Sequence, residues 1–140
     1  MAFWYCYYHF IWSTYQRAPL LEANLEALVH VWIRDKSSAL EAEVLAVNGT
    51  ETHVHVAASV PPKISPAEWV RNVKGFTAHE ANSRFPDLLE RFRWQSGYGV
   101  LTISPRHVDY VVNYVNRQKQ HHAENTLNPN FERIALDSDQ

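Results

Sequence analysis

Two histidines separated by one residue are the first side chains in this sequence whose type and spacing suggest chemistry. His53 and His55 lie in the stretch ETHVHVAAS, among small and β-branched residues typical of a strand. Alternate residues of a strand point to the same face, so the imidazoles share one side and Val54 points to the other. Two neighbouring imidazoles can bind one divalent metal ion. Paired histidines are also common as ordinary polar residues on an exposed strand, so the pair alone does not decide.

A tyrosine and a glutamine near the C-terminus supply a second candidate group. Tyr114 and Gln118 are four residues apart, so they share one face of a helix. A phenol becomes a nucleophile when its proton is removed, and an amide oxygen suits Mg²⁺ or Mn²⁺. His121 and His122 extend the same face by a further turn. Spacing leaves Tyr110 equally eligible, and it leaves open that Tyr114 is a core-edge aromatic and Gln118 merely solvated.

Basic and aromatic residues mix in the stretch RWQSGYG. Arg93 could contact phosphate there while Trp94 stacks on a nucleobase, although a turn with a half-buried tryptophan would look the same. Arg71 and Lys74 lie on the polar face of a predicted helix, where they would add positive charge or simply be solvated. The sequence contains no CxxC, GxGxxG, P-loop or HExxH motif.

Hydrophobic periodicity predicts the elements that must position these side chains. The order is β-α-β-β-α-β-α, which indicates an α+β, ferredoxin-like antiparallel sheet with an additional C-terminal helix that carries the tyrosine. The turn dipeptide Asn48-Gly49 predicts a hairpin between the second and third strands. The expected elements are a strand over 3–13, a helix over 20–36, two strands within 37–60, a helix from Pro66 capped by Ser65, a strand over 98–104 and a last helix from Pro105.

Length and charge predict one domain with a short tail. The 140 residues suffice for a single core, and 46% of them are hydrophobic and 20% charged. We predict a domain over residues 1–123 and an acidic tail over 124–140, in which four acids face one base. The net charge of −2 does not by itself indicate a nucleic-acid binder.

The chain shows no feature of a secreted or membrane protein. Cys6 is the only cysteine and cannot form an internal disulfide, which favours a reducing, cytoplasmic setting. No apolar run approaches the roughly 18 to 20 residues of a membrane helix. The apolar start lacks the basic region and cleavage site of a signal peptide.

Several stretches, taken in order, resemble one known family. They are YHFIWSTYQRAPLL, HVH, VPPKISPAEWVRNVKG, WQSGYGVLTIS and YVNRQKQHH. Together they are similar to the small single-tyrosine HUH transposases of bacterial insertion sequences, the TnpA type, including REP-associated relatives. The similarity runs from about Tyr8 to His122.

The resemblance implies a division of labour among the candidate residues. His53, His55 and Gln118 would bind the metal, Mg²⁺ or Mn²⁺, and Tyr114 rather than Tyr110 would be the nucleophile. The implied activity cleaves and rejoins single-stranded DNA at hairpin-bearing insertion-sequence ends through a 5′-phosphotyrosine intermediate. The implied partners are that DNA and a second subunit in a homodimer, with no membrane and no organic cofactor. The candidate DNA-binding residues Arg71, Lys74, Arg93 and Trp94 rest on their charge and aromatic character and not on the resemblance.

Two other classes of function compete with this interpretation. A domesticated descendant could bind DNA hairpins and lack catalysis. An RNA-binding ferredoxin-like domain would fit the aromatic strands, but it would leave the histidine, tyrosine and glutamine set unexplained.

Overall fold

The computed structural model describes residues 3–134, and its elements follow the predicted order. Asp137 and Asp139 of the predicted acidic tail lie outside the described residues. Short 3₁₀ turns cover Tyr15–Arg17, Pro105–His107 and Pro129–Phe131. The strands and helices are β1 (Tyr7–Ser13), α1 (Ala23–Ala39), β2 (Glu43–Gly49), β3 (His53–Ser59), α2 (Pro66–Arg84), β4 (Gly99–Ile103), α3 (Val108–Asn116) and α4 (Gln118–Glu124).

The four strands form one antiparallel sheet in the order β2-β3-β1-β4. This order and the βαββαβ succession confirm the ferredoxin-like, α+β prediction. The two central strands are β3 and β1, and their register places Ile11 opposite His55 and Ser13 opposite His53. The register therefore puts the histidine pair in the middle of the sheet rather than at an edge.

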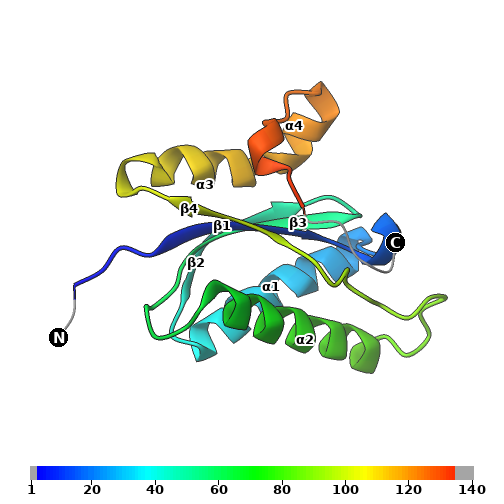
Figure 1. Cartoon of the computed structure of the whole chain (residues 1–140). Coiled ribbons are helices and arrows are strands. Elements are labelled where there is room, and N and C mark those ends of the chain that lie inside the picture. The colour runs from blue at the N-terminus through cyan, green and yellow to red at the C-terminus, as the bar shows by residue number, and fades with distance from the viewer. Residues whose placement is uncertain (1–2, 135–140) are drawn as a thin grey trace.

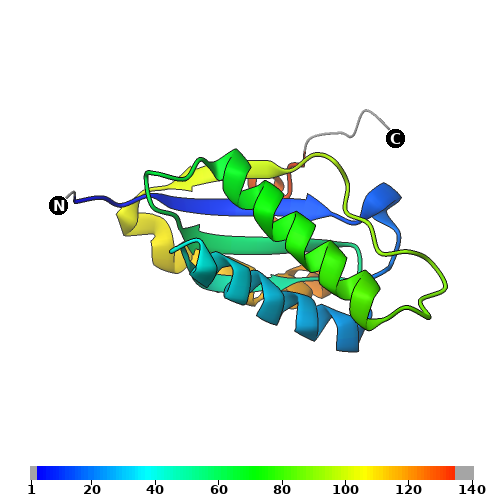
Figure 2. The same ribbon diagram turned by 90° about the horizontal axis from the view of Figure 1, so that it is seen from below.

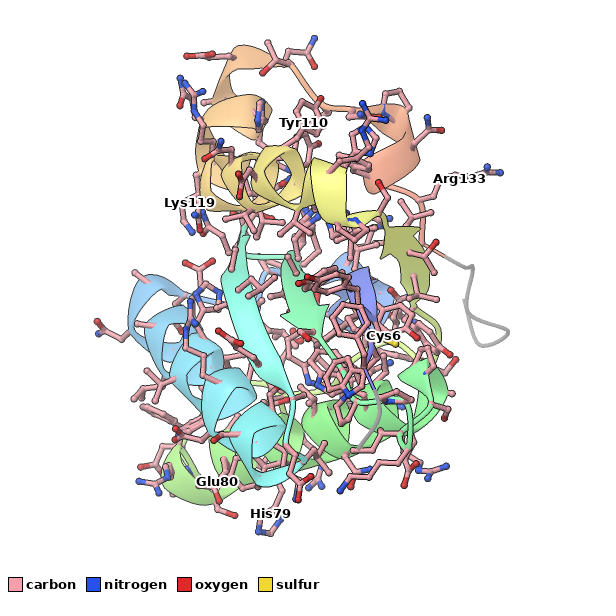
Figure 3. All side chains as sticks on the ribbon, turned by 90° about the vertical axis from the view of Figure 1, so that its left-hand side faces the viewer. Cys6, His79, Glu80, Tyr110, Lys119 and Arg133 are labelled. Carbon is pink, nitrogen blue, oxygen red and sulfur yellow. The ribbon has the colours of Figure 1, made fainter. Side chains whose placement is uncertain are left out.

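Helices cover both faces of this sheet. In Figure 1, α1 and α2 lie below the strands, and α3 and α4 lie above them. The view from below shows α1 and α2 running side by side across the strands (Figure 2). Figure 3 shows Tyr110 and Lys119 in the α3–α4 layer, whereas His79 and Glu80 lie in the α2 layer on the far side of the sheet.

The α1–α2 face holds the larger hydrophobic core. Phe10 and Trp12 point into it from β1, and the Phe10 ring stacks on Trp69 with centroids 4.2 Å apart. Ser65 caps α2 as predicted: its side chain accepts a hydrogen bond from the Glu68 backbone N–H at 3.1 Å. The α3–α4 face has a smaller apolar cluster of Ala46, Ala57, Ile103, Val111 and Val115.

Two local predictions were wrong. Asn48 and Gly49 are the last residues of β2, and the turn lies at 50–52. A Cβ at Gly49 would lie 2.1 Å from the His53 carbonyl oxygen, so the glycine here permits close strand approach rather than a turn. The last helix is two helices, because the chain leaves helical geometry at Arg117.

Two segment boundaries also differ from the predictions. The first strand begins at Tyr7 and not at Phe3, since the Phe3 and Tyr5 side chains are exposed and, of residues 3–6, Cys6 accepts one backbone hydrogen bond, from Val60. The first helix covers Ala23–Ala39 instead of 20–36. Within residues 3–134, none of the helices combines the length and apolar character that a membrane crossing requires.

Candidate functional site

The histidine pair of β3 is buried and held by hydrogen bonds on one side of each ring. His53 is 4% exposed and His55 is fully buried. The Thr50 hydroxyl lies 2.9 Å from His53 Nδ1, and His9 Nε2 lies 2.8 Å from His55 Nδ1. These contacts orient both rings and leave the Nε2 atoms directed at the α3–α4 layer.

Tyr114 and Gln118 reach this space from the helices above, although they belong to different helices. Tyr114 lies in the last turn of α3 and Gln118 is the first residue of α4. Both side chains are buried. The Tyr114 ring centroid lies 6.1 Å from that of His55. The four residues predicted as nucleophile and metal ligands thus converge within a single chain. Tyr110, by contrast, is 58% exposed and lies outside the cluster.

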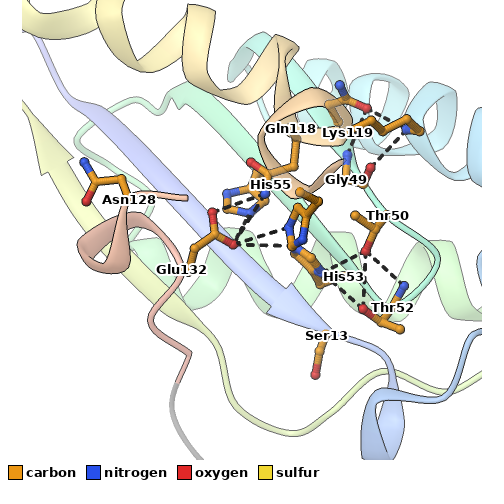
Figure 4. A network of polar contacts seen from close by, with 12 residues as sticks. Ser13, Gly49, Thr50, Thr52, His53, His55, Gln118, Lys119, Asn128 and Glu132 are labelled. Carbon is orange, nitrogen blue, oxygen red and sulfur yellow. Dashed lines mark hydrogen bonds and ion pairs between the residues drawn. The ribbon is translucent and has the colours of Figure 1, made fainter. Parts of the chain in front are cut away.

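The carboxylate of Glu132 occupies the centre of this cluster (Figure 4). Its Oε1 atom lies 3.2 Å from His55 Nε2 and 3.6 Å from His53 Nε2. Its Oε2 atom accepts a short hydrogen bond from the Tyr114 hydroxyl and one from Gln118 Nε2 at 3.2 Å. Glu132 belongs to the segment that follows α4, so the predicted acidic tail places a charge among the predicted functional residues.

Burial and this carboxylate set the protonation of the cluster. Burial lowers the pKa of His55, which favours the neutral imidazole that binds metals. Burial, followed by the hydrogen bond to Glu132, raises the pKa of Tyr114 and keeps the phenol protonated. Burial would raise the pKa of Glu132, but hydrogen bonds from His53 and His55 outweigh it and hold that pKa well below its usual range.

The donor set is suited to a divalent cation. Gln118 Oε1 is buried and has no hydrogen-bond partner among the described residues, as expected of an atom that awaits a ligand. His53, His122 and Glu132 also bring three possible ligand atoms within 4.8 Å of one another. Imidazole nitrogen, amide oxygen and carboxylate oxygen together suit Mn²⁺, Zn²⁺ or Mg²⁺.

The predicted DNA-binding residues gather elsewhere, on the α2 side of the sheet. A cavity of about 620 Å³ between α2 and the segment before β4 is lined by all four of them, Arg71, Lys74, Arg93 and Trp94. Arg71 and Arg93 are exposed, and the Arg93 guanidinium lies 4.0 Å from the Tyr15 ring centroid. Trp94 is only 9% exposed and donates to the Thr77 hydroxyl at 2.9 Å, so its ring is not accessible for base stacking.

Sequence reasoning missed two members of the cluster and underrated a third. Glu132 gave no signal, because no spacing rule links it to residues 77 positions away. His9 carries no spacing signal within its apolar strand, and its Nε2 atom contacts His55 Nδ1 at 2.8 Å. His122 was noted only as an extension of the tyrosine face, and its Nε2 lies 3.1 Å from that of His53.

Comparison with known proteins places the chain among transposases. The model of the family described as "Transposase IS200 like" matches residues 2–118. The ISDra2 transposase TnpA of Deinococcus radiodurans is 26% identical over 115 residues, which cover 79% of this chain and 82% of the relative. The transposase of insertion sequence element IS200 from Salmonella typhimurium is 23% identical over 119 residues, which cover 82% and 78%.

Solved structures agree with these sequence matches. A Deinococcus radiodurans crystal structure described as a transposase superposes with a TM-score of 0.69 and 25% identity, covering 84% of this chain and 95% of its own. A REP-associated tyrosine transposase bound to a REP hairpin superposes with a TM-score of 0.65 and 16% identity, covering 87% and 73%. The second match concerns the fold alone.

Proposed function

The chain belongs to the family of IS200-like transposases, and on that premise we propose that it cleaves and rejoins single-stranded DNA at insertion-sequence ends through a 5′-phosphotyrosine intermediate. The observation that carries this proposal is the convergence of Tyr114, His53, His55 and Gln118 around one buried polar centre. A phenol beside a cation site is the arrangement that a tyrosine nucleophile needs for phosphoryl transfer.

The residues divide the cleavage step among them. The Tyr114 oxygen attacks the scissile phosphorus, the bond from phosphorus to the 3′ oxygen breaks, and the leaving oxygen takes a proton to become a 3′ hydroxyl. Glu132 accepts the hydrogen bond of the Tyr114 hydroxyl and orients the phenol for attack; its lowered pKa makes it a weak base, so the phenol's proton passes to solvent water. When bound by His53, His55 and Gln118, Mg²⁺ or Mn²⁺ would polarise the phosphate.

A single-stranded DNA hairpin is the proposed partner. One structural relative was solved with a REP hairpin, and the exposed Arg71 and Arg93 offer positive charge beside the cavity of the α2 layer. We assign these two residues to phosphate contacts. Lys74, also predicted to bind DNA, donates to the backbone carbonyls of Gln95 and Gly97 at 2.5 and 3.1 Å, so we assign it, with Trp94, to shaping the cavity. Cytoplasmic location, inferred from the lone cysteine, stays a prediction.

A covalent adduct tests the proposed function. Single-stranded oligonucleotides carrying hairpins from the DNA that flanks the coding sequence are incubated with the protein and Mg²⁺ or Mn²⁺, then separated under denaturing conditions. We expect a protein–DNA adduct that Tyr114→Phe abolishes and that Tyr110→Phe, the matched control on the exposed face, retains. Hairpin binding without any adduct would instead favour the domesticated binding protein.

The proposed homodimer raises the question of which subunit supplies the tyrosine. All four residues meet within one chain here, which favours action within a subunit. Mixing Tyr114→Phe with His53→Ala protein separates the cases. We expect no adduct from the mixture if the tyrosine serves its own histidines, and restored adduct if it serves those of a second subunit.

A further inference from the structure

Three ligand atoms from distant parts of the chain form a small triangle in the α3–α4 layer. His53 Nε2 and His122 Nε2 lie 3.1 Å apart, and Glu132 Oε1 lies 3.6 Å from the first and 3.8 Å from the second. A point equidistant from three such corners lies about 2.0 Å from each, close to the roughly 2.0–2.2 Å bonds of Zn²⁺ to imidazole nitrogen and carboxylate oxygen. One cation slightly out of this plane would therefore contact all three atoms without rearrangement.

We propose that His122 and Glu132, together with His53, bind a divalent transition-metal ion, so that the segment after α3 supplies two of its three ligands. The inference rests on the proposed function, because it concerns the same site. Cation binding is measured without DNA, so its test does not depend on DNA cleavage. His122 and Glu132 then take the ligand places of His55 and Gln118, whose Nε2 atoms hydrogen-bond the Glu132 carboxylate.

The surroundings of His53 direct a lone pair at the centre of the triangle. Its Nδ1 atom lies 2.9 Å from the Thr50 hydroxyl and 3.2 Å from the Thr52 hydroxyl, and either hydroxyl oxygen can accept a hydrogen bond from a protonated Nδ1. With Nδ1 protonated, Nε2 is unprotonated and faces His122 Nε2 across 3.1 Å. Two imidazole nitrogens at this separation share one proton or bind one cation, and metal binding would release the proton.

His55 and Gln118 support the carboxylate in this arrangement. His55 Nε2 lies 3.2 Å from Glu132 Oε1, and Gln118 Nε2 lies 3.2 Å from Glu132 Oε2. Both contacts hold Glu132 in place beside His53. Positioning of a ligating carboxylate by neighbouring hydrogen-bond partners is common around protein metal sites and affects affinity by about 10- to 100-fold.

The backbone of the tail is also fixed against the sheet. A Cβ placed on Gly99 of β4 would lie 2.2 Å from the Arg133 carbonyl oxygen, so the segment beside Glu132 packs directly on this glycine. Gly99 contributes no ligand atom and lies in an edge strand. Gly99→Ala therefore moves Glu132 away while every ligand side chain stays unchanged.

The donor chemistry predicts which ions the site prefers. Two imidazoles and one carboxylate leave open positions and favour first-row transition metals over Mg²⁺, which selects oxygen ligands. We expect Co²⁺, Mn²⁺ and Zn²⁺ to bind the DNA-free protein with a stoichiometry of one and Mg²⁺ to bind more weakly. Co²⁺ also reports ligand replacement through its visible absorption.

Co²⁺ titration of the DNA-free protein tests the assignment. We expect His122→Ala and Glu132→Gln each to weaken binding by about 10-fold or more and to change the Co²⁺ spectrum. His79→Ala and Glu90→Gln are matched controls, because both side chains are exposed and outside the cluster. Circular dichroism before titration verifies the fold, and Gly99→Ala gives the same loss of affinity without altering any ligand.

The outcomes separate this inference from the proposed function. Wild-type Co²⁺ affinity and spectrum in His122→Ala and Glu132→Gln overturn the inference. If those two variants bind Co²⁺ normally while His55→Ala and Gln118→Ala lose it, the metal is bound by His53, His55 and Gln118 as in the proposed function. If a hairpin adduct forms while no variant affects cation binding, the tyrosine chemistry stands and the metal assignment fails.

Discussion

The two faces of the sheet bury different kinds of side chain. Under α1 and α2, β1 contributes Phe10 and Trp12 to an aromatic core. Under α3 and α4, the same strand contributes His9, which is 1% exposed and touches His55. Burial, and to a smaller extent repulsion between a protonated His9 and a protonated His55, lowers the pKa of His9 to about 3. Burying apolar area stabilises the fold, whereas burying an imidazole costs free energy unless its nitrogens find partners.

The difference indicates that stability and chemistry are assigned to opposite faces. The α1–α2 face is mostly apolar, with a few buried polar contacts such as Trp94 to Thr77, and Trp12 Nε1 has no hydrogen-bond partner among the described residues. The α3–α4 face carries unsatisfied polar atoms, His9 Nδ1 and Gln118 Oε1, of the kind that functional sites retain.

Truncation on the two faces should have unequal effects on stability. We expect Phe10→Ala to lower the free energy of unfolding by about 3–5 kcal/mol, because the ring is fully buried against Trp69, and Val115→Ala to lower it by about 2 kcal/mol. Urea denaturation followed by circular dichroism measures both. If the two variants lost equal free energy of unfolding, apolar packing would not be concentrated on the α1–α2 face.

Acid should destabilise the chain through buried histidine outside the cluster as well. Burial, with Lys119 and Arg34 nearby, lowers the pKa of His30 from 6.5 to about 4. Well above pH 6.5, His30 is neutral in both the folded and the unfolded chain, so it does not lower the free energy of unfolding. As the pH falls below 6.5, the unfolded chain binds a proton that the folded chain excludes, so stability decreases by about 2 kcal/mol at pH 5.

His30→Leu isolates this contribution. The variant should lose less stability between pH 7 and pH 5 than the parent does, by about the same 2 kcal/mol, in urea denaturation at the two pH values. An unchanged difference between the two pH values would mean that acid sensitivity arises on the α3–α4 face alone.

Lys119 links the two helical layers across the edge of the sheet and should have the smallest effect. Its ammonium donates to Glu26 of α1 and to Asn48 and Gly49 of β2, at 3.0, 2.8 and 3.0 Å. Because the side chain is more than half exposed, we expect Lys119→Met to cost about 1 kcal/mol. Thermal melts at low and high salt measure the stability of Lys119→Met. A loss greater than that of Val115→Ala would mean that the Lys119 contacts are not those of an exposed side chain.

Local sequence patterns predicted the order of the elements and the faces of the candidate residues. Alternation placed His53 and His55 on one side of a strand, and the spacing of Tyr114 and Gln118 put them near one another even though the helix breaks at Arg117. Period and capping are properties of neighbouring residues, so they can be read without knowing the rest of the fold. The resemblance to single-tyrosine transposases then suggested roles for these four residues.

Only the tertiary structure decided what completes the cluster and what is accessible. Glu132 contacts His55 across 77 residues, and Trp94, for which the sequence left base stacking and a half-buried position both open, is enclosed by the α1–α2 core. The hairpin turn lies at 50–52 and not at the predicted Asn48-Gly49. Asn48 and Gly49 instead end β2, where the two strands approach closely. Such contacts depend on the packing of distant segments against a sheet. No periodicity along the chain encodes which tail residue arrives beside which histidine, because that choice is made by shape and burial in three dimensions.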